Sequence, residues 1–210
     1  VVETGFYDKR ALEKQIYPVM LYNKKVDFYN FGVYPSVSNK LIKKKIIWNN
    51  RCKDERITMG EDAACIYASL LEAQSLFVME KYYYHYRQNM TSMTKAYDKN
   101  RFLKYQYLLK YMDQKLGSRG YGLDEQLKYH RAFRVKHAIL NESKAEGSVH
   151  ERAKELKVKM EEYGFVDAFD NLELKNTGLG SKLFIWFVRR RMYDELIRMC
   201  DVFNWLQKWK

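Results

Sequence analysis

Apolar residues recur at helical spacing through the second half of the chain. Phe102, Tyr105, Leu109, Met112 and Leu116 follow one another in steps of three and four through an otherwise polar segment, which is typical of one face of an amphipathic helix. Glycines between 117 and 122 are expected to end this helix. Further helical patterns cover about 123–140, 149–163 and 183–209. Residues 95–210 are therefore predicted to be helical.

The first 94 residues mix short patterns of both kinds. Residues 1–50 predict loops and short elements, with a helical turn near 8–14. Pro18 and Pro35, the only prolines, are expected at element boundaries because each restricts the residue before it. Helical spacing predicts a helix over 61–73. The β-prone runs 75–79 and 82–86 predict either a strand pair or two consecutive segments at a sheet edge, with a loop over 88–94.

Together these patterns predict an α+β fold that is mainly helical, with few short strands. Only ten glycines and two prolines occur in 210 residues, which disfavours turn-rich all-β designs. A hydrophobic content of 47% is enough for a real core and excludes disorder of the whole chain. The change of pattern divides the chain into a mixed region, 1–94, and a helical region, 95–210.

The chain is strongly basic. Lys and Arg number 38 against 26 Asp and Glu, and the formal charge of +12 favours anionic partners such as nucleic acid, lipid headgroups or nucleotide phosphates. The longest apolar runs, such as 183–188, are far shorter than the roughly 20 residues that a membrane-spanning helix needs. Three scattered cysteines without a Cys-x-x-Cys pair favour a reducing compartment and disfavour a zinc site.

The histidines and the common catalytic motifs give little support for a metal or hydrolase site. The four histidines show no metal-binding spacing, and His130 and His137, one heptad apart, are expected on a helix surface or at the edge of the core. The sequence has neither a Gly-x-x-x-x-Gly-Lys phosphate loop nor a Gly-x-Ser-x-Gly elbow.

Residues 59–64 form the strongest chemical candidate. Gly60 allows a tight approach into the predicted helix, and Asp62 places a carboxylate in its first turn. The positive end of the helix dipole favours the ionised carboxylate, which a proton acceptor requires at neutral pH. Taken alone, the motif is better explained by acidic residues that cap the start of an Ala-rich helix.

Other short motifs surround this candidate in a definite order. Gly60-Glu61-Asp62 is followed by the β-prone runs, then by Tyr84-His85-Tyr86-Arg87 and by Ser92-Met93, while similar segments at 5–9, 16–18 and 35–41 lie upstream. This order resembles the C-terminal half of bacterial family 2 glycosyltransferases. The resemblance covers about residues 1–94 and lies in the order of the motifs.

The resemblance implies the acceptor-side portion of a glycosyltransferase A-type fold, followed by a helical extension. It implies that Asp62 is the general base that deprotonates the acceptor hydroxyl, and that Glu61 helps to orient the acceptor or the helix. A sugar would pass with inversion from a nucleotide-sugar donor to a cell-surface polysaccharide or lipid-linked acceptor. His85 and Arg87 are expected near the donor phosphates or the acceptor cleft; the alternative, a solvent-facing strand, is stronger for His85.

The N-terminal half of that family has no counterpart in this sequence. In the family this half holds the nucleotide and, through Asp-x-Asp, a divalent cation, Mg²⁺ or Mn²⁺; the sequence has no Asp-x-Asp. The cation is therefore expected in the missing half and not in this chain, and the isolated chain is predicted to be inactive. The resemblance implies a cytoplasmic location, peripheral at the inner face of the cytoplasmic membrane.

The C-terminal segment 182–191 joins aromatic residues to a basic cluster. Trp186 with Arg189, Arg190 and Arg191 is the combination expected of a helix that lies in a membrane interface. Anionic lipid would attract the arginines.

The alternative for this segment is an amphipathic helix that packs on the catalytic domain, with its arginines in water. Trp205 and Trp209 would then cover the core. We expect core positions for Phe187, Cys200 and Phe203.

Two other classes of function compete with the enzyme. Eighteen tyrosines and 38 basic side chains suit an RNA-binding module, although nucleic acid is disfavoured because no ribonucleoprotein motif occurs. A helical interaction scaffold would suit the region after 95. The enzyme hypothesis predicts that Asp62 lies at the rim of an open cleft and that exposed apolar surface faces the missing half.

Overall fold

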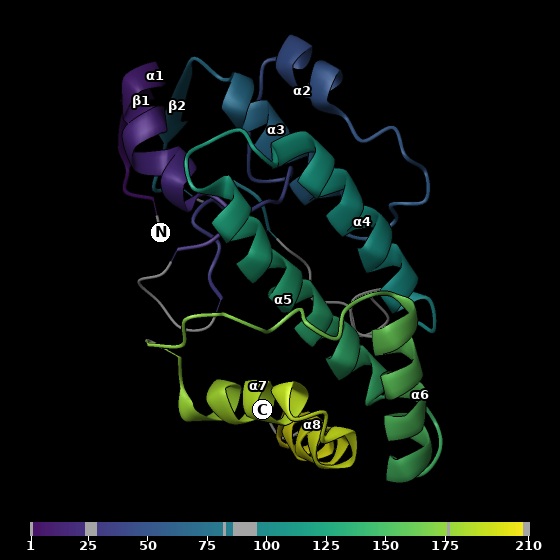
Figure 1. The fold of residues 1–210 in the computed structure, drawn as a ribbon. Coiled ribbons are helices and arrows are strands. Elements are labelled where there is room, and N and C mark those ends of the chain that lie inside the picture. The colour runs from purple at the N-terminus through teal and green to yellow at the C-terminus, as the bar shows by residue number, and fades with distance from the viewer. Residues whose placement is uncertain (1, 24–28, 82, 86–95, 176, 208–210) are drawn as a thin grey trace.

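The N-terminal region is organised around a two-stranded antiparallel sheet. A computed structural model describes residues 2–23, 29–81, 83–85, 96–175 and 177–207 of the chain. In it β1 (Gly5–Asp8) pairs with β2 (Ser75–Val78), so that Phe6 lies opposite Phe77. Helices dominate the rest of the described residues (Figure 1), which confirms the predicted mainly helical α+β class.

The helical segment that follows β1 changes type along its length. α1 (Lys9–Ala11) begins after Asp8, whose Oδ1 accepts a hydrogen bond from the Ala11 amide at 2.8 Å. It continues into a π-helical turn, η1 (Leu12–Ile16), and a 3₁₀ turn, η2 (Tyr17–Val19). The predicted helical turn at 8–14 is confirmed, and Pro18 lies in the 3₁₀ turn where the segment ends.

The partner of β2 differs from the sequence prediction. Residues 83–85 form no strand, and β2 pairs with β1, about 70 positions earlier in the chain. The cause lies at the end of α3 (Glu61–Glu72), where Tyr17 Oη donates to the Leu70 carbonyl at 3.0 Å and Lys9 Nζ donates to the Leu71 carbonyl at 3.1 Å. These long-range bonds satisfy carbonyls at the helix end and bring β2 beside β1.

Three of the four helices predicted for the second half are confirmed. α4 (Arg101–Leu116) and α5 (Leu123–Glu142) lie side by side, and α6 (Val149–Glu162) follows them (Figure 1). Ser148 and Glu151 form a reciprocal capping box that fixes the start of α6. A further helix, α2 (Lys44–Asn50), packs against α3 and was not predicted.

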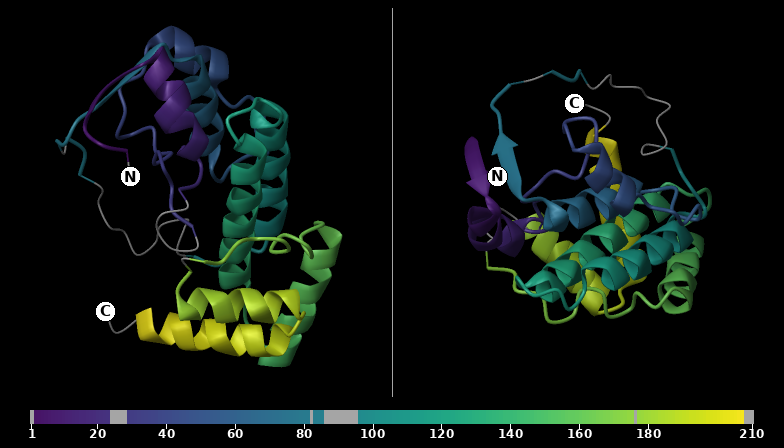
Figure 2. Two further views of the ribbon diagram at one scale, coloured as in Figure 1. Left: turned by 60° about the vertical axis from the view of Figure 1, so that its left-hand side comes forward. Right: turned by 90° about the horizontal axis from the view of Figure 1, so that it is seen from above.

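The C-terminal helical pattern contains two helices, which corrects the prediction of one. α7 (Leu179–Arg189) and α8 (Tyr193–Gln207) pack side by side as a hairpin (Figure 2). Arg191 has a positive φ of 55°, and the Met192 amide donates to the Phe187 carbonyl at 3.0 Å. This is a helix-ending motif with a left-handed residue, and it occurs here without the usual glycine.

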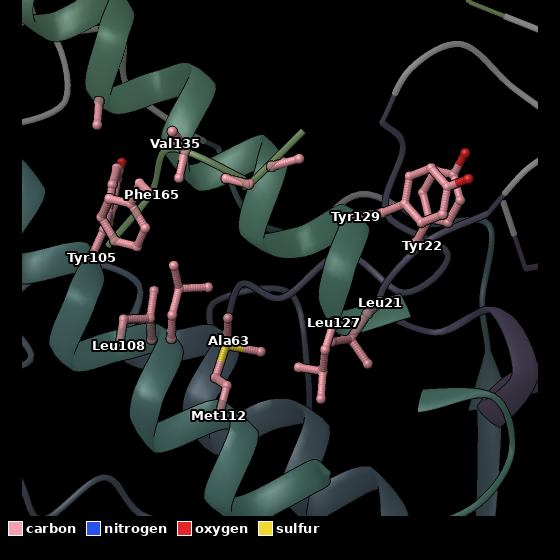
Figure 3. Packing of buried hydrophobic residues seen from close by; sticks show 14 of the residues in the cluster. Leu21, Tyr22, Ala63, Tyr105, Leu108, Met112, Leu127, Tyr129, Val135 and Phe165 are labelled. Atoms are coloured by element: carbon pink, nitrogen blue, oxygen red, sulfur yellow. The ribbon is translucent and has the colours of Figure 1, made fainter. Parts of the chain in front are cut away.

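One hydrophobic core continues across residue 94. Tyr22 stacks on Tyr129 of α5 with ring centroids 3.9 Å apart, and Ala63 of α3 lies beside Met112 of α4 (Figure 3). The buried side chain of Gln126 accepts a bond from the Leu21 amide and donates one to the Tyr17 carbonyl, each at 2.9 Å. The two predicted regions thus share packing, and their division at residue 94 stays a prediction.

Candidate functional site

The start of α3 is fixed by a close approach of its backbone to two other helices. Gly60 precedes the helix with φ of 88°, in the left-handed region. A Cβ at this position would lie 2.5 Å from Leu108 Cδ2 of α4 and 3.2 Å from Arg134 Nη2 of α5. Glycine is therefore required here both by backbone conformation and by space. The position of the first turn, with Asp62 in it, follows from this packing.

Asp62 is held by a loop that precedes it by 25 residues. The Val37 amide donates a hydrogen bond to Asp62 Oδ2 at 3.2 Å, and the side chain is half exposed. The buried Tyr67, one and a half turns along α3, donates from its hydroxyl to the Val33 carbonyl at 3.0 Å and so fixes the same loop. The carboxylate is thus oriented by a backbone donor at the positive end of a helix and stays accessible to solvent.

Lys40 closes the loop close to this carboxylate. Its Nζ donates to the Tyr34 carbonyl, to the Ser36 carbonyl at 2.8 Å and to Asn39 Oδ1 at 2.6 Å. Burial lowers the pKa of Lys40 to about 8, and the negative charge of Asp62 opposes that shift. Lys40 therefore fastens the loop through three oxygen acceptors, and the nearby Asp62 charge favours its protonated form.

An exposed aromatic ring lies on the same loop. Tyr34 is 61% exposed, although its ring meets Phe31 edge to face at 5.6 Å. Phe31 in turn contacts Phe133 of α5 at 5.3 Å. The loop therefore presents one aromatic face to solvent and is anchored through another to the core.

A buried histidine and arginine lie behind the start of α3. His130 is fully buried, which corrects its expected place on the helix surface or at the core edge. Arg134 Nε donates to His130 Nε2 at 3.1 Å, while His130 Nδ1 has no hydrogen-bond partner within the part of the chain that the structure describes. Burial, together with the Arg134 charge, lowers the pKa of His130, so the ring is neutral. In the sequence, only the separation of four residues between His130 and Arg134, which places them on one face of a helix, indicated this pair.

Two cysteines that are scattered in the sequence lie together in the fold. The Cys52 amide donates to Cys65 Sγ at 3.0 Å, and both side chains are half-buried. Burial raises the pKa of the Cys65 thiol, which keeps it protonated and weakly nucleophilic at neutral pH. Cys65 therefore lacks the lowered thiol pKa of a catalytic thiolate.

The remaining residues predicted from the glycosyltransferase resemblance are dispersed. Glu61 is exposed on the first turn of α3, and His85 is exposed in a segment without regular structure. Within the described residues no hydrogen bond or ion pair joins either of them to Asp62. Arg87 lies outside the residues that the structure describes. The roles of Glu61, His85 and Arg87 stay predictions.

Two surface cavities lie away from Asp62. One of about 330 Å³ is lined by residues of α4 and α5, including Asp113, Asp124 and Arg131, and another of about 570 Å³ lies beside Arg189. Asp62 lines neither, and it lies instead half exposed on the surface. Among the described residues no three His, Cys, Asp or Glu side chains gather as candidate metal ligands.

The C-terminal cluster predicted for a membrane surface separates into two kinds of residue. Trp186 is 47% exposed, and Arg190 and Arg191 are exposed. Arg189 instead donates to the Phe169 carbonyl at 2.8 Å through Nη2 and at 3.0 Å through Nε, and it ties α7 to the connection after α6.

The core positions expected in this region are partly confirmed. Cys200 is buried and Phe187 is half-buried, but Phe203 is 47% and Trp205 58% exposed, which corrects both expectations. Trp209 lies outside the described residues. No helix in the described residues is long and apolar enough to cross a membrane.

Comparison with protein-family models, curated proteins and solved structures finds no match for this chain.

Proposed function

We propose that this chain is the acceptor-side portion of an inverting glycosyltransferase, with Asp62 as the general base. The observation that carries the proposal is the half-exposed Asp62 carboxylate, held at the start of α3 by the Val37 amide. A nucleotide sugar would be the donor, and a saccharide or lipid-linked hydroxyl the acceptor. The order of motifs around Asp62, which resembles that of family 2 glycosyltransferases, is a second line of support.

In the proposed step Asp62 accepts the proton of the acceptor hydroxyl. The acceptor oxygen forms a bond to the anomeric carbon while the bond from that carbon to the nucleoside diphosphate breaks, and the sugar inverts. The base must be ionised and must face the acceptor before the step. Asp62 lies at the positive end of the dipole of α3, and the Val37 amide restricts rotation of its carboxylate.

The exposed ring of Tyr34 supports an acceptor site next to this base. The backbone carbonyl of Tyr34 accepts a hydrogen bond from Lys40 Nζ. Tyr34 therefore belongs to the loop whose Val37 amide holds Asp62. The apolar face of a sugar ring suits such a surface, because it covers aromatic area without loss of the sugar's hydrogen bonds to water.

The small sheet supports a partner on the donor side. The cross-strand pair Phe6 and Phe77 is 68% and 61% exposed on the same face of the sheet. A two-stranded sheet is marginal by itself, and exposed aromatic residues on one face suit burial against another layer. We assign this face to contact with a nucleotide-binding half, which would bring the donor to Asp62.

The test uses the chain joined to a nucleotide-binding half in one polypeptide. Release of nucleoside diphosphate from nucleotide sugars is measured with saccharide and lipid-linked acceptors, for the natural protein and for Asp62→Asn. Acceptor-dependent release that Asp62→Asn abolishes would support the proposal, and undiminished release would remove Asp62 from the role of base. Tight RNA binding that falls steeply with salt, without any transfer, would favour the RNA-binding module instead.

A further inference from the structure

α7 carries large apolar residues on two opposite faces. Phe184, Ile185 and Val188 are buried against the rest of the protein, with at most 3% exposure. Leu179, Leu183 and Trp186 lie on the opposite face and are 85%, 46% and 47% exposed. These three, which we call the α7 stripe, recur in steps of four and three and fall within about 60° on a helix of 3.6 residues per turn. The fold uses one face of α7 and leaves the other in solvent.

The neighbouring helix extends this apolar surface. The C-terminal half of α8 also carries large apolar side chains that are between 47% and 58% exposed, namely Val202, Phe203, Trp205 and Leu206. Because α7 and α8 form a hairpin, the end of α8 lies near the beginning of α7 (Figure 2). Both helices of the hairpin therefore expose large apolar residues, and exposed apolar surface of this kind marks an interaction site.

The charged residues of α7 itself are all basic. Residues 174–193 contain no Asp or Glu and five basic residues. Lys182 and Arg190 are exposed on α7 and at its end, and Arg190 falls on the same side of the helix as the α7 stripe. Arg191 is exposed next to it, whereas Arg189 is bound to the Phe169 carbonyl. Exposed apolar residues that share their helix face and its end with basic residues fit a partner that is both apolar and anionic.

We propose that the α7 stripe docks this protein on an anionic membrane surface, with α7 lying in the plane of the interface. Leu179, Leu183 and Trp186 would enter the boundary between headgroups and acyl chains, and Lys182 and Arg190 would contact anionic headgroups. This surface binding is separate from glycosyl transfer and does not depend on it. A second copy of the chain fits the same stripe less well, because it would bring two basic surfaces together.

The test is cosedimentation of the full chain with lipid vesicles. Vesicles of phosphatidylcholine alone are compared with vesicles that contain 30% phosphatidylglycerol. We expect binding to the anionic vesicles, weak binding to the neutral ones, and a loss of affinity as salt rises. Equal binding to both vesicle types, or no binding to either, would overturn the proposal.

Substitutions distinguish binding through the α7 stripe from nonspecific binding of this basic chain to vesicles. Leu183→Ser with Trp186→Ser should weaken vesicle binding about tenfold or more, because both side chains lose burial in lipid. The matched control is Trp48→Ser on α2, whose indole is 58% exposed outside the stripe and whose change should leave binding unaltered. Equal losses in the stripe variant and the control would overturn the proposal.

Charge reversal tests the second part of the surface. Lys182→Glu with Arg190→Glu should weaken binding to anionic vesicles by about 20-fold or more, and should not weaken binding to neutral vesicles. Both residues are exposed, so the circular dichroism spectrum should stay that of the natural chain. Unchanged binding to anionic vesicles would contradict the assigned role of the basic residues.

Light scattering tests whether a second copy of the chain, and not a membrane, covers the α7 stripe. If a second copy covers the stripe, the natural chain should be a dimer, Trp186→Ser should be a monomer, and neither should bind vesicles. That combination would overturn the membrane proposal. A monomer that binds anionic vesicles through the stripe supports it.

Discussion

α3 and α7 both begin directly after a glycine, but their first turns and outer faces differ. After Gly60, α3 places Glu61 and Asp62 in its first turn, where negative charge complements the helix dipole. After Gly178, α7 has no acidic residue in its first turn and begins with the exposed Leu179. The polar start of α3 is engaged by a loop of the same chain, whereas the α7 stripe faces solvent.

This difference distinguishes residues that stabilise the fold from exposed residues that are available to a binding partner. At α3 the carboxylate, the loop and the buried tyrosine belong to one hydrogen-bonded arrangement. At α7 only the inner face contributes to the core. Variants at α3 should therefore change transfer activity or stability, whereas variants at the α7 stripe should change surface binding and leave stability almost unaltered.

Asp62→Asn should have the largest effect. In the protein joined to its nucleotide-binding half, we expect glycosyl transfer to fall by about 10²- to 10⁴-fold, because the amide cannot accept the proton. Folding should be intact, since the amide oxygen still accepts a bond from the Val37 amide. The matched control is Glu55→Gln, an exposed carboxylate outside α3, which should leave transfer unchanged. A similar loss in both variants would refute a specific role for Asp62.

Gly60→Ala should destabilise the start of α3 by about 2–3 kcal/mol. The new Cβ would meet Leu108 and adopt a strained positive φ. Gly120→Ala is a matched control, because Gly120 has a similar φ of 82° but nothing within 4 Å of its Cβ position. The free energy of unfolding of the Gly120→Ala control should fall by only about 1 kcal/mol. Urea unfolding measures both, and equal losses would show that the close approach of α3 to α4 contributes nothing.

His130 should make stability depend on pH. Its pKa is lowered in the folded protein, so below about pH 6.5 the unfolded chain binds more protons than the folded one. Stability should therefore be full above this pH and fall as pH drops, by at most about 1.4 kcal/mol per unit from this group. His130→Gln, which does not titrate, should show a flatter profile of unfolding free energy between pH 7.5 and 5. An unchanged slope would assign the pH dependence to other groups.

Tyr67→Phe should lower the free energy of unfolding by about 1 kcal/mol. The variant removes the hydrogen bond from the Tyr67 hydroxyl to the Val33 carbonyl, and that carbonyl then lacks this donor. Tyr34→Phe is the control, since the Tyr34 side chain is 61% exposed and its loss of a hydroxyl should not change stability measurably. Thermal unfolding compares the two variants. Equal midpoints would indicate that the loop 33–40 is not held by α3.

The α7 stripe should contribute least to stability. Leu183→Ser and Trp186→Ser should each change the unfolding free energy by no more than about 0.5 kcal/mol, because both side chains face solvent. Val188→Ala, on the buried face of the same helix, should cost more than about 1 kcal/mol. A large loss from the stripe variants would mean that the fold itself uses this surface.

Local patterns predicted the long helices well. α4, α5 and α6 were recognised because their apolar positions repeat every three or four residues, and burial of that face is the main source of helix stability in a protein. The break between α7 and α8 was missed because its left-handed residue is Arg191, and no glycine or proline marks it. α2 was missed because the sequence of this seven-residue helix begins in a basic stretch.

The candidate site was predictable only in part. Asp62 in the first turn of α3 follows from the sequence around Gly60, but its bond to the Val37 amide joins residues 25 positions apart. The same limit applies to the contact between Cys52 and Cys65 and to the neighbours of Gly60 on α4 and α5. Propensity and periodicity describe the chain within about one helix, and they carry no information on which loop returns to which turn.

The mainly helical class, the positions of α4, α5 and α6 and the net charge follow from the order and composition of the residues, because each depends on neighbours along the chain or on residue counts. The strand that β2 joins, the lack of room for a side chain at Gly60 and the solvent-facing side of α7 depend on contacts between distant segments. The reason is physical: burial and long-range hydrogen bonds are set by groups that meet only after the chain has folded, whereas helical periodicity is already present in the order of the residues.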